Sequence, residues 1–470
     1  MLDAIEQFSA SLVQVVFSSV RLGGVDIQLI VLWLAVAMVF FTFRLGFLNV
    51  RGFGAAVDIL RGRRADPSAP GEISQQAALA TALSGTVGLG NIAGVAIAIS
   101  IGGPGAAFWM FVIGFFAMSL KFAEVTLAVK YRQQTADGRY TGGPMWTLRN
   151  AFASRGRPRI GKVLGGIYAG FAIFAFIQII QINQSYAQLN VIMGFGETKW
   201  TAFAYGLIVA FAAGMVLIGG VKSIARVTTA LVPFMGGLYV IGVLMILALN
   251  VREIPGALEL IFSEAMNPSS VQGGVLGAFV AGMRRAVYSS EAGIGSSAIA
   301  HAIAKTRSPA SEGFVALLEP FIDTVVICTA TALAIVTSGA WRLGLNDIAM
   351  TSAAFETVSV WFPYLLAVAV FLFAFSTIIA TGYYALQAWK YLAGSSRTLS
   401  RLYMLFFCGS LPLGALMDVS TAVNIIDSLF FLLAAPNIIG LYIFSNEIAR
   451  DAGAYLQEAR RNKAIERNED

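Results

Sequence analysis

The chain has 470 residues, of which 57% are hydrophobic and only 12% are charged. Soluble domains carry about 25% charged residues, so this composition excludes a soluble globular protein and predicts an all-α integral membrane protein. The net charge of +6 does not by itself indicate nucleic-acid binding, and we expect no nucleic-acid partner. One histidine and two cysteines provide no metal cluster and no Ser-His-Asp arrangement, so we do not expect an enzyme.

Eleven apolar stretches approach or exceed the roughly 20 residues that a membrane-spanning helix requires. They lie at about residues 29–43, 73–101, 106–129, 163–193, 201–218, 227–249, 275–302, 314–336, 365–389, 402–417 and 423–444. Basic residues gather in the connections after the first, third, fifth, seventh and ninth stretches, and in the C-terminal tail. The positive-inside rule therefore predicts an N-terminus outside the membrane and a C-terminus in the cytoplasm.

The second stretch contains a glycine-rich interruption at residues 82–94, Ala-Leu-Ser-Gly-Thr-Val-Gly-Leu-Gly-Asn-Ile-Ala-Gly. Each glycine inside a helix costs about 1 kcal/mol relative to alanine, so this segment is a weak point. Unwound backbone inside a membrane is tolerated only where protein or a watery cavity surrounds it, and secondary transporters place their binding sites at such breaks. The alternative is a helix-packing face, because Gly90 and Gly94 form a GxxxG pair.

The seventh stretch contains a similar interruption at residues 287–297, Val-Tyr-Ser-Ser-Glu-Ala-Gly-Ile-Gly-Ser-Ser. Its carboxylate, Glu291, costs several kcal/mol at this depth unless it is paired, solvated or protonated, so it is a candidate functional residue. The alternative is that Glu291 closes a structural hydrogen-bond network. The two interruptions lie five spans apart and would therefore have opposite orientations, which predicts two inverted five-span repeats preceded by one additional span.

This pattern divides the chain into four parts. We expect an N-terminal helix, the first span and a basic loop in residues 1–70. The first five-helix repeat would occupy residues 71–250 and the inverted repeat residues 251–445. Residues 446–470 would form a cytoplasmic tail.

Several motifs resemble those of the alanine or glycine:cation symporter family. They are Ser-Gly-Thr-Val-Gly-Leu-Gly-Asn-Ile-Ala-Gly at 84–94, Gly-Gly-Pro-Gly-Ala-Ala-Phe-Trp at 102–109, Leu-Lys-Phe-Ala-Glu at 120–124, Gly-Gly-Pro-Met at 142–145, Ser-Glu-Ala-Gly-Ile-Gly-Ser at 290–296, Ala-His-Ala at 300–302 and Glu-Pro-Phe-Ile-Asp-Thr at 319–324. The resemblance covers about residues 70–445. It implies a leucine-transporter fold in a bacterial plasma membrane, and symport of a small neutral amino acid with sodium or, in some members, a proton.

The resemblance also assigns residues to a substrate site. The amides of Leu89 and Gly90, beside Gly88, would bind the substrate carboxylate, as exposed N–H groups at a helix start do. Carbonyls in the seventh span would face the ammonium group. The complete set of substrate-binding residues is Gly88, Leu89, Gly90, Gln181, Tyr288, Glu291, Ile294, Thr377 and Thr381.

Two sodium sites follow from the same resemblance, since hard cations prefer oxygen ligands. The first would use the carbonyls of Ser84, Val87 and Phe373 with the hydroxyls of Ser376 and Thr377. The second, next to the substrate, would use Thr86, Asn91 and Ser289. Asp323 is a further candidate, although a structural hydrogen bond explains it equally well.

Two departures from the family pattern concern the size of the pocket. Residues 376–384 read Ser-Thr-Ile-Ile-Ala-Thr-Gly-Tyr-Tyr, where the family usually has Ser-Thr-Ile-Leu-Gly-Trp-Ser-Tyr-Tyr. Thr381 thus replaces an indole one helical turn from Thr377. In the fourth span the family's Gly-Asn appears as Ile177 and Gln178. These changes predict a pocket that admits an amino acid larger or more polar than alanine.

Other functions and features remain open from the sequence. An uncoupled channel or facilitator also lines its pore with glycines and hydroxyls, but its flux would not depend on a sodium gradient. Lys121 and Glu124 are three residues apart and are expected to form an ion pair. The sequence specifies no oligomeric state, and a monomer is the simplest expectation.

Overall fold

Helices dominate the computed structural model, which describes residues 2–22, 25–63, 66, 68–194, 198–267, 274–417 and 419–469. The elements up to residue 193 are α1 (Leu2–Val16), β1 (Ser19–Leu22), β2 (Val25–Gln28), α2 (Leu29–Arg44), α3 (Leu48–Arg51), α4 (Phe53–Leu60), α5 (Gln75–Thr86), the 3₁₀ turn η1 (Leu89–Asn91), α6 (Ala93–Gly102), α7 (Gly105–Lys130), β3 (Gln133–Gln134), β4 (Tyr140–Thr141), α8 (Pro144–Ser154), α9 (Pro158–Ala175) and α10 (Ile179–Met193). The remaining elements are α11 (Lys199–Ile218), α12 (Gly220–Leu249), η2 (Val251–Glu253), α13 (Ile254–Met266), α14 (Gly274–Ser290), α15 (Ala298–His301), α16 (Pro309–Pro320), the π-helix η3 (Phe321–Cys328), α17 (Thr329–Thr337), η4 (Ala340–Leu343), α18 (Asp347–Glu356), α19 (Phe362–Ala393), α20 (Arg397–Gly414), α21 (Val419–Ile443) and α22 (Ser445–Glu469).

Each of the eleven predicted stretches contains one to three helical segments. Among the described residues, seven helices are long and apolar enough to cross a bilayer, and the bent pair α5 and α6 makes eight. Helix α2 is apolar but has only 16 residues, so it does not meet the same length requirement. The helical membrane class is therefore confirmed, whereas the count of eleven spans stays a prediction.

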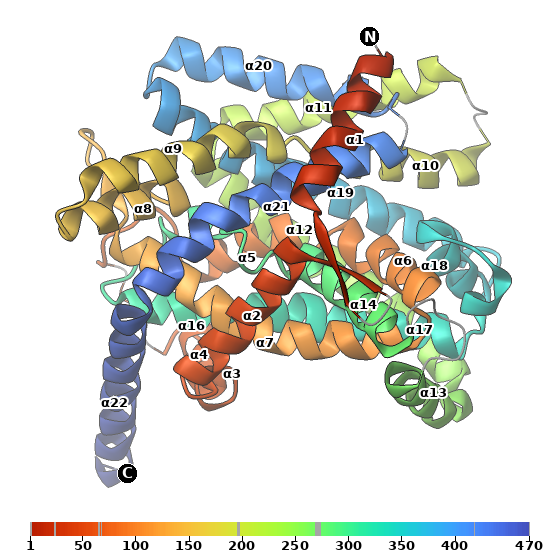
Figure 1. Ribbon diagram of the computed structural model, residues 1–470, viewed down its shortest axis with the longest axis horizontal. Helices are drawn as coiled ribbons and strands as arrows, with labels where there is room; N and C mark the ends of the chain where they lie inside the picture. Colours follow the sequence, from red (N-terminus) through yellow and green to blue (C-terminus); the bar gives the residue numbers. More distant parts are fainter. Residues whose placement is uncertain are drawn as a thin grey trace.

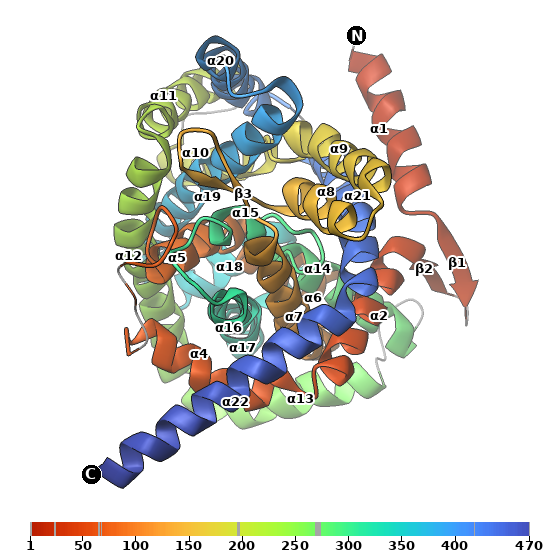
Figure 2. The same ribbon diagram turned by 90° about the vertical axis from the view of Figure 1, so that its left-hand side faces the viewer.

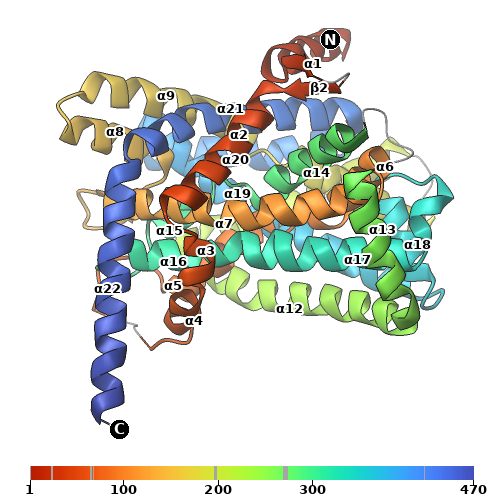
Figure 3. The same ribbon diagram turned by 60° about the horizontal axis from the view of Figure 1, so that its bottom comes forward.

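The four short helices next to the predicted interruptions lie in the interior of the bundle. Figure 2 shows α5, α6, α14 and α15 surrounded by the longer helices. Helix α7 packs on α14 and α16, while α19 packs on α5, α9 and α12. Figure 3 shows α7, the α16–α17 segment and α12 running side by side. The last helix, α22, projects away from the bundle (Figure 1).

Two helical irregularities were not expected from the sequence. The fourth predicted span is divided between α9 and α10, and no glycine or proline lies in the junction from Phe176 to Gln178. The eighth contains the π-helix η3, which begins directly after Pro320. A π-helical turn is uncommon and often marks a functional site. Both irregularities lie beside the interrupted helices.

The chain segments that precede α5 and follow α15 are joined to each other. The amide of Lys305 donates to the carbonyl of Ile73 at 2.8 Å, and the amide of Glu72 donates to the carbonyl of Ile303 at 2.7 Å. The guanidinium of Arg132 connects the same two segments by donating to four carbonyls. These belong to Pro70, Ala302, Ala304 and Thr306, at 2.8–3.2 Å. The bundle is therefore closed at this end.

Candidate functional site

The first interruption separates α5 from α6, whose axes differ by 61°. Helix α5 ends at Thr86, and Val87 and Gly88 adopt extended backbone conformations before η1 begins. The amide of Gly88 donates to Oδ1 of Asn91 at 2.9 Å, which replaces a hydrogen bond that the unwound backbone has lost. The glycine-rich segment is thus a break in the helix, as the sequence predicts, rather than a straight packing face.

The second interruption lies between α14 and α15, and three of its residues have a positive φ. These are Glu291 at 51°, Gly293 at 93° and Gly295 at 82°. A left-handed conformation is ordinary for glycine but costs about 1 kcal/mol or more for a glutamate, and such strain is concentrated at functional sites. The Glu291 carboxylate is buried and accepts a hydrogen bond from the hydroxyl of Ser296.

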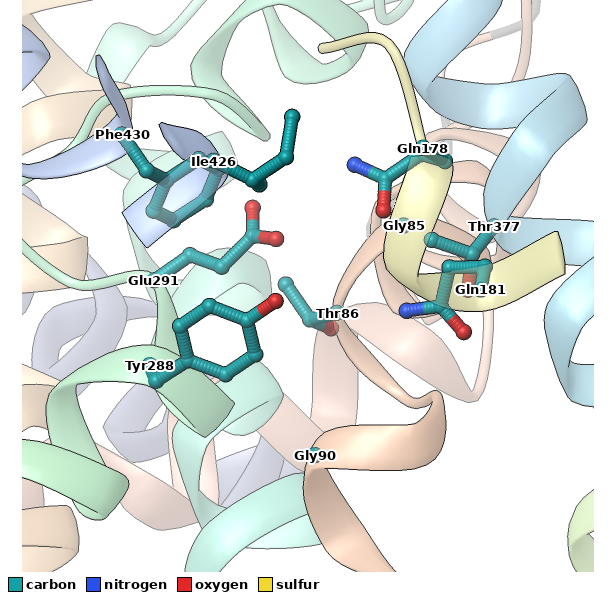
Figure 4. Close-up of a pocket in the computed structure, with 10 residues that line it drawn as sticks. All are labelled: Gly85, Thr86, Gly90, Gln178, Gln181, Tyr288, Glu291, Thr377, Ile426 and Phe430. Carbon is teal, nitrogen blue, oxygen red and sulfur yellow. The ribbon is translucent and has the colours of Figure 1, made fainter. Parts of the chain in front are cut away.

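A narrow pocket lies between the two breaks (Figure 4). Its lining residues come from α5 and η1, from the α9–α10 junction and α10, from the end of α14 and the second break, and from α19 and α21. They are Gly85, Thr86, Gly90, Gln178, Gln181, Tyr288, Glu291, Thr377, Ile426 and Phe430. Figure 4 shows the Glu291 carboxylate and the Gln178 amide pointing into the same space from opposite sides. The arrangement suits a small ligand that carries both charged and polar groups.

The structure brings most of the predicted substrate residues to this pocket. Gly88 does not line it, but a Cβ there would lie 3.0 Å from Oγ1 of Thr377 and 3.2 Å from Nε2 of Gln181. The backbone of Gly88 is therefore next to two lining side chains. Leu89 and Ile294 are buried but are not part of the pocket wall.

Thr381 is also outside the pocket wall, contrary to the sequence-based interpretation of the missing indole. Its hydroxyl donates to the carbonyl of Thr377 at 2.7 Å, so the side chain turns back onto α19. The replacement at Gln178, in contrast, does lie in the wall.

Sequence reasoning missed three lining residues, Gly85, Ile426 and Phe430. Ile426 and Phe430 lie one turn apart on α21 and form the apolar side of the pocket. An isoleucine and a phenylalanine in an apolar membrane helix carry no distinguishing signal, so only the packing of α21 against the breaks reveals them.

Three of the residues predicted for the first sodium site, Ser84, Phe373 and Ser376, are joined by hydrogen bonds between α5 and α19. The hydroxyl of Ser84 donates to the carbonyl of Ser376 at 2.7 Å, and the hydroxyl of Ser376 donates to the carbonyl of Phe373 at 3.0 Å. Oγ1 of Thr377 is buried and has no hydrogen-bond partner among the described residues. Val87 is buried at the end of α5. Hard cations prefer such oxygen ligands, and the hydroxyl of Thr377 is a further oxygen without a partner among the described residues.

A second oxygen-rich cluster connects both breaks to η3. Nδ2 of Asn91 donates to Oδ1 of Asp323 at 2.6 Å, and the hydroxyl of Ser289 donates to Oδ2 of Asp323 at 2.5 Å. Thr324 adds a further hydroxyl, which lies 2.9 Å from Oδ2 of Asp323. Thr86 is not part of these contacts, since its hydroxyl donates to the carbonyl of Ala82 at 3.3 Å and its side chain lines the pocket. Asp323 is therefore the centre of this cluster.

The predicted ion pair on α7 is confirmed and belongs to a larger buried group. Nζ of Lys121 lies 3.8 Å from Glu124 and 3.7 Å from Glu319, and it donates to the hydroxyl of Ser297 at 3.0 Å. Within the described part of the chain, no group of three or more His, Cys, Asp or Glu side chains is arranged to hold a metal ion. The buried charged residues Lys121, Glu124 and Glu319 thus pair with one another.

Comparisons with known proteins agree with this architecture. Residues 10–469 match a family model described as "Sodium:alanine symporter family". The chain is 37% identical to the sodium/alanine symporter AgcS of Methanococcus maripaludis, over 91% of this chain and 93% of that protein. It is 32% identical to the "Probable sodium/glutamine symporter GlnT" of Bacillus subtilis, over 90% and 87% of the two chains. The crystal structure of MhsT in complex with L-phenylalanine is similar in fold, with a TM-score of 0.56 and 17% identity over 82% of this chain and 93% of MhsT.

Proposed function

The chain belongs to the sodium:alanine symporter family, and from this premise we propose that it imports a small neutral amino acid together with sodium by alternating access. One observation carries the proposal: the pocket lies between two broken helices and has polar lining groups from both of them. Secondary transporters bind substrates at such breaks because the unwound backbone supplies free donors and acceptors. The likeness to MhsT supports the leucine-transporter fold that this mechanism requires.

The substrate would lie with its two charged groups towards different breaks. Amides at the start of η1, at Leu89 and Gly90, would bind the carboxylate. The ammonium group would face Glu291 and the carbonyls at the end of α14. Oε1 of Gln181 is buried without a hydrogen-bond partner among the described residues, so it is available to accept from the bound amino acid.

Gln178 would determine which side chains fit. It stands at the pocket wall opposite Glu291, where the family resemblance predicts an asparagine. Its amide can both donate and accept, which favours a substrate that is more polar than alanine. AgcS is named a sodium/alanine symporter and GlnT a sodium/glutamine symporter, so relatives of similar identity carry names of both classes.

Sodium would bind at the two oxygen clusters. The first, formed by Ser84, Val87, Phe373, Ser376 and Thr377, connects the first broken helix to α19. The second, formed by Asn91, Ser289 and Asp323, connects the two breaks directly. An ion that ties the breaks together would make binding of sodium and substrate mutually dependent, because each would stabilise the same conformation.

We propose the membrane arrangement that the sequence predicts. Eleven spans would comprise one additional helix and two inverted repeats, 71–250 and 251–445. The C-terminal tail and the end of the bundle that Arg132 closes would face the cytoplasm.

Counterflow of labelled amino acids into proteoliposomes, with and without sodium, tests this function. The panel should contain alanine, glycine, serine, threonine, glutamine, leucine and methionine. We expect sodium-dependent exchange of at least one polar or medium-sized member. Exchange that is equally fast in the absence of sodium would indicate a facilitator, and net uptake driven equally well by a proton gradient alone would overturn sodium coupling.

A further inference from the structure

The only histidine of the chain, His301, lies in a buried charged cluster that the proposed substrate and sodium sites do not use. The cluster contains Lys121 and Glu124 of α7, and Glu312 and Glu319 of α16. The side chains of all five residues are completely buried. Groups of this kind are costly inside a membrane protein and are therefore expected to serve a function.

Both ring nitrogens of His301 contact a carboxylate. Nδ1 lies 2.5 Å from Oε1 of Glu312, and Nε2 lies 2.6 Å from Oε1 of Glu319. A contact of this length between a nitrogen and a carboxylate oxygen requires a proton between them. A neutral imidazole carries a single N–H, so it can donate to only one of the two carboxylates. At the other contact, a nitrogen lone pair would face an oxygen lone pair. The triad of His301, Glu312 and Glu319 therefore holds one proton more than a neutral ring and two carboxylates would.

The charges around the triad favour keeping this proton, and Lys121, 3.7 Å from Glu319, favours leaving that carboxylate ionised with the proton on the ring. Of the elements packed against α15, helix α7 presents Lys121 and Glu124, and α16 presents the two triad glutamates. Helix α5 has no ionisable residue, and α19 contributes Tyr384, whose hydroxyl donates to the carbonyl of Thr81.

Two further charges lie at the ends of this region. The guanidinium of Arg132 donates to the carbonyls of Ala302 and Ala304. Glu291 accepts a hydrogen bond from Ser296, which is adjacent to Ser297, the residue that Lys121 contacts. With an imidazolium, three positive groups (Lys121, Arg132 and His301) face four carboxylates (Glu124, Glu291, Glu312 and Glu319). Loss of the extra proton would raise the buried excess of negative charge from one to two, which is unfavourable at low dielectric.

His301 lies where a conformational change of the bundle would alter its contacts with Glu312 and Glu319. Helix α15 is a short element between the second break and the segment that pairs with Ile73 at the closed end of the bundle. If the protein works by alternating access, as we propose above, this end must open, and α15 must then move relative to α16. Opening would separate the ring from Glu312 or Glu319 and admit water.

We propose that His301, held between Glu312 and Glu319, is a proton-binding site that is occupied while this end is closed and exchanges with water when it opens. In the exchange, one ring N–H transfers its proton to water, which leaves a neutral imidazole and two carboxylates. The transport cycle would then depend on the pH of the side to which this end opens, independently of the sodium sites.

Because the chain has a single histidine, labelling it with ¹⁵N reports on this site alone. The experiment uses the full chain in lipid nanodiscs, with an affinity tag that contains no histidine. We expect two ring N–H groups at pH 7.5 in the wild type, and loss of one proton at a pH at least one unit lower in Glu312→Gln. Glu447→Gln is the matched control, since that carboxylate pairs with Lys130 rather than with His301 and should leave the spectrum unchanged. A wild-type ring with a single N–H throughout pH 6–8 would overturn the proton site.

A second measurement tests the connection with transport. Sodium-driven uptake into proteoliposomes is measured with the pH on the side of the closed end varied from 6 to 8.5. We expect at least a fivefold change in the wild type and in Glu447→Gln, and a flat profile in His301→Gln and Glu312→Gln. Equal profiles in all four proteins would overturn exchange during the cycle. If no amino acid is transported at all, the proposed function fails, whereas the ¹⁵N spectrum still decides whether His301 binds the proton.

Discussion

The two broken helices use different chemistry at the same pocket. The first break presents neutral groups, namely backbone amides, hydroxyls and the amide of Asn91, and its bend depends on extended residues at Val87 and Gly88. The second break presents the carboxylate of Glu291 on a left-handed backbone. It continues through Ser296 and Ser297 to the buried charges on α7 and α16.

This difference suggests a division of roles. Neutral dipoles at the first break can bind a carboxylate or a sodium ion without a large change in net charge. The second break is attached to ionised groups, so a movement there changes the pairing of buried charges, which costs several kcal/mol when a partner is lost. We therefore expect substitutions in the first break to weaken binding, and substitutions in the second to impair the transport cycle.

The largest effect is expected from Glu291→Gln. The amide keeps the shape of the side chain but removes the buried charge, so we expect transport normalised to expression to fall about 100-fold, which corresponds to roughly 2.7 kcal/mol. Glu253→Gln makes the same change at an exposed position and serves as the control. Near-normal uptake by Glu291→Gln would mean that the glutamate only closes a structural hydrogen-bond network.

Gly88→Ala should weaken substrate binding. Its Cβ would lie 3.0 Å from Oγ1 of Thr377 and 3.2 Å from Nε2 of Gln181, and overpacking of this kind costs about 2 kcal/mol. We expect substrate affinity to fall roughly 30-fold in a detergent binding assay. At Gly94 of α6 a Cβ would meet no atom within 4 Å, so Gly94→Ala should bind normally. Equal affinities of the two variants would contradict close packing at the first break.

Thr377→Ala tests the first sodium site. Removal of one ligand oxygen worth about 1.4 kcal/mol should raise the sodium concentration for half-maximal uptake roughly tenfold. The control is Thr229→Ala in α12, where the lost hydroxyl bonds only the carbonyl of Ala225 in its own helix. An unchanged sodium dependence in Thr377→Ala would remove this threonine from the ion site.

The smallest effect is expected at the exposed contact between Asp66 and Arg307, which connects the segments that lead to the two breaks. Hydrogen bonds from Ser68 and Arg307 lower the pKa of the exposed Asp66 to about 2. Because its pKa is depressed, this contact stabilises the protein above about pH 4 and is lost only as the pH falls towards 2. Arg307→Ala should change uptake less than twofold, with the same pH profile as the wild type between pH 6 and 8.5. A profile altered by this variant would assign part of the pH dependence to the exposed contact rather than to His301.

Much of the fold and part of the site could be predicted from local sequence. Glycines surrounded by hydroxyls predicted both breaks, because a helix in hydrocarbon cannot lose its backbone hydrogen bonds without replacement. Six of the residues named in advance for substrate or sodium line the pocket: Thr86, Gly90, Gln181, Tyr288, Glu291 and Thr377. Thr86, Gly90, Tyr288 and Glu291 lie in the two glycine-interrupted segments, whereas Gln181 and Thr377 were assigned only through the resemblance to the family.

Tertiary packing decided the rest. Ile426 and Phe430 are ordinary membrane residues, and only the approach of α21 to the breaks makes them part of the pocket. Thr381 shares a helical face with Thr377, but its hydroxyl bonds the carbonyl of Thr377 and the residue does not line the pocket, which periodicity alone does not reveal. The pairing of His301 with Glu312 and Glu319 likewise depends on where α15 meets α16. Sequence determined where the helices break and which groups are costly to bury; only the fold determined which of those groups meet, because contacts between distant segments depend on how the helices pack.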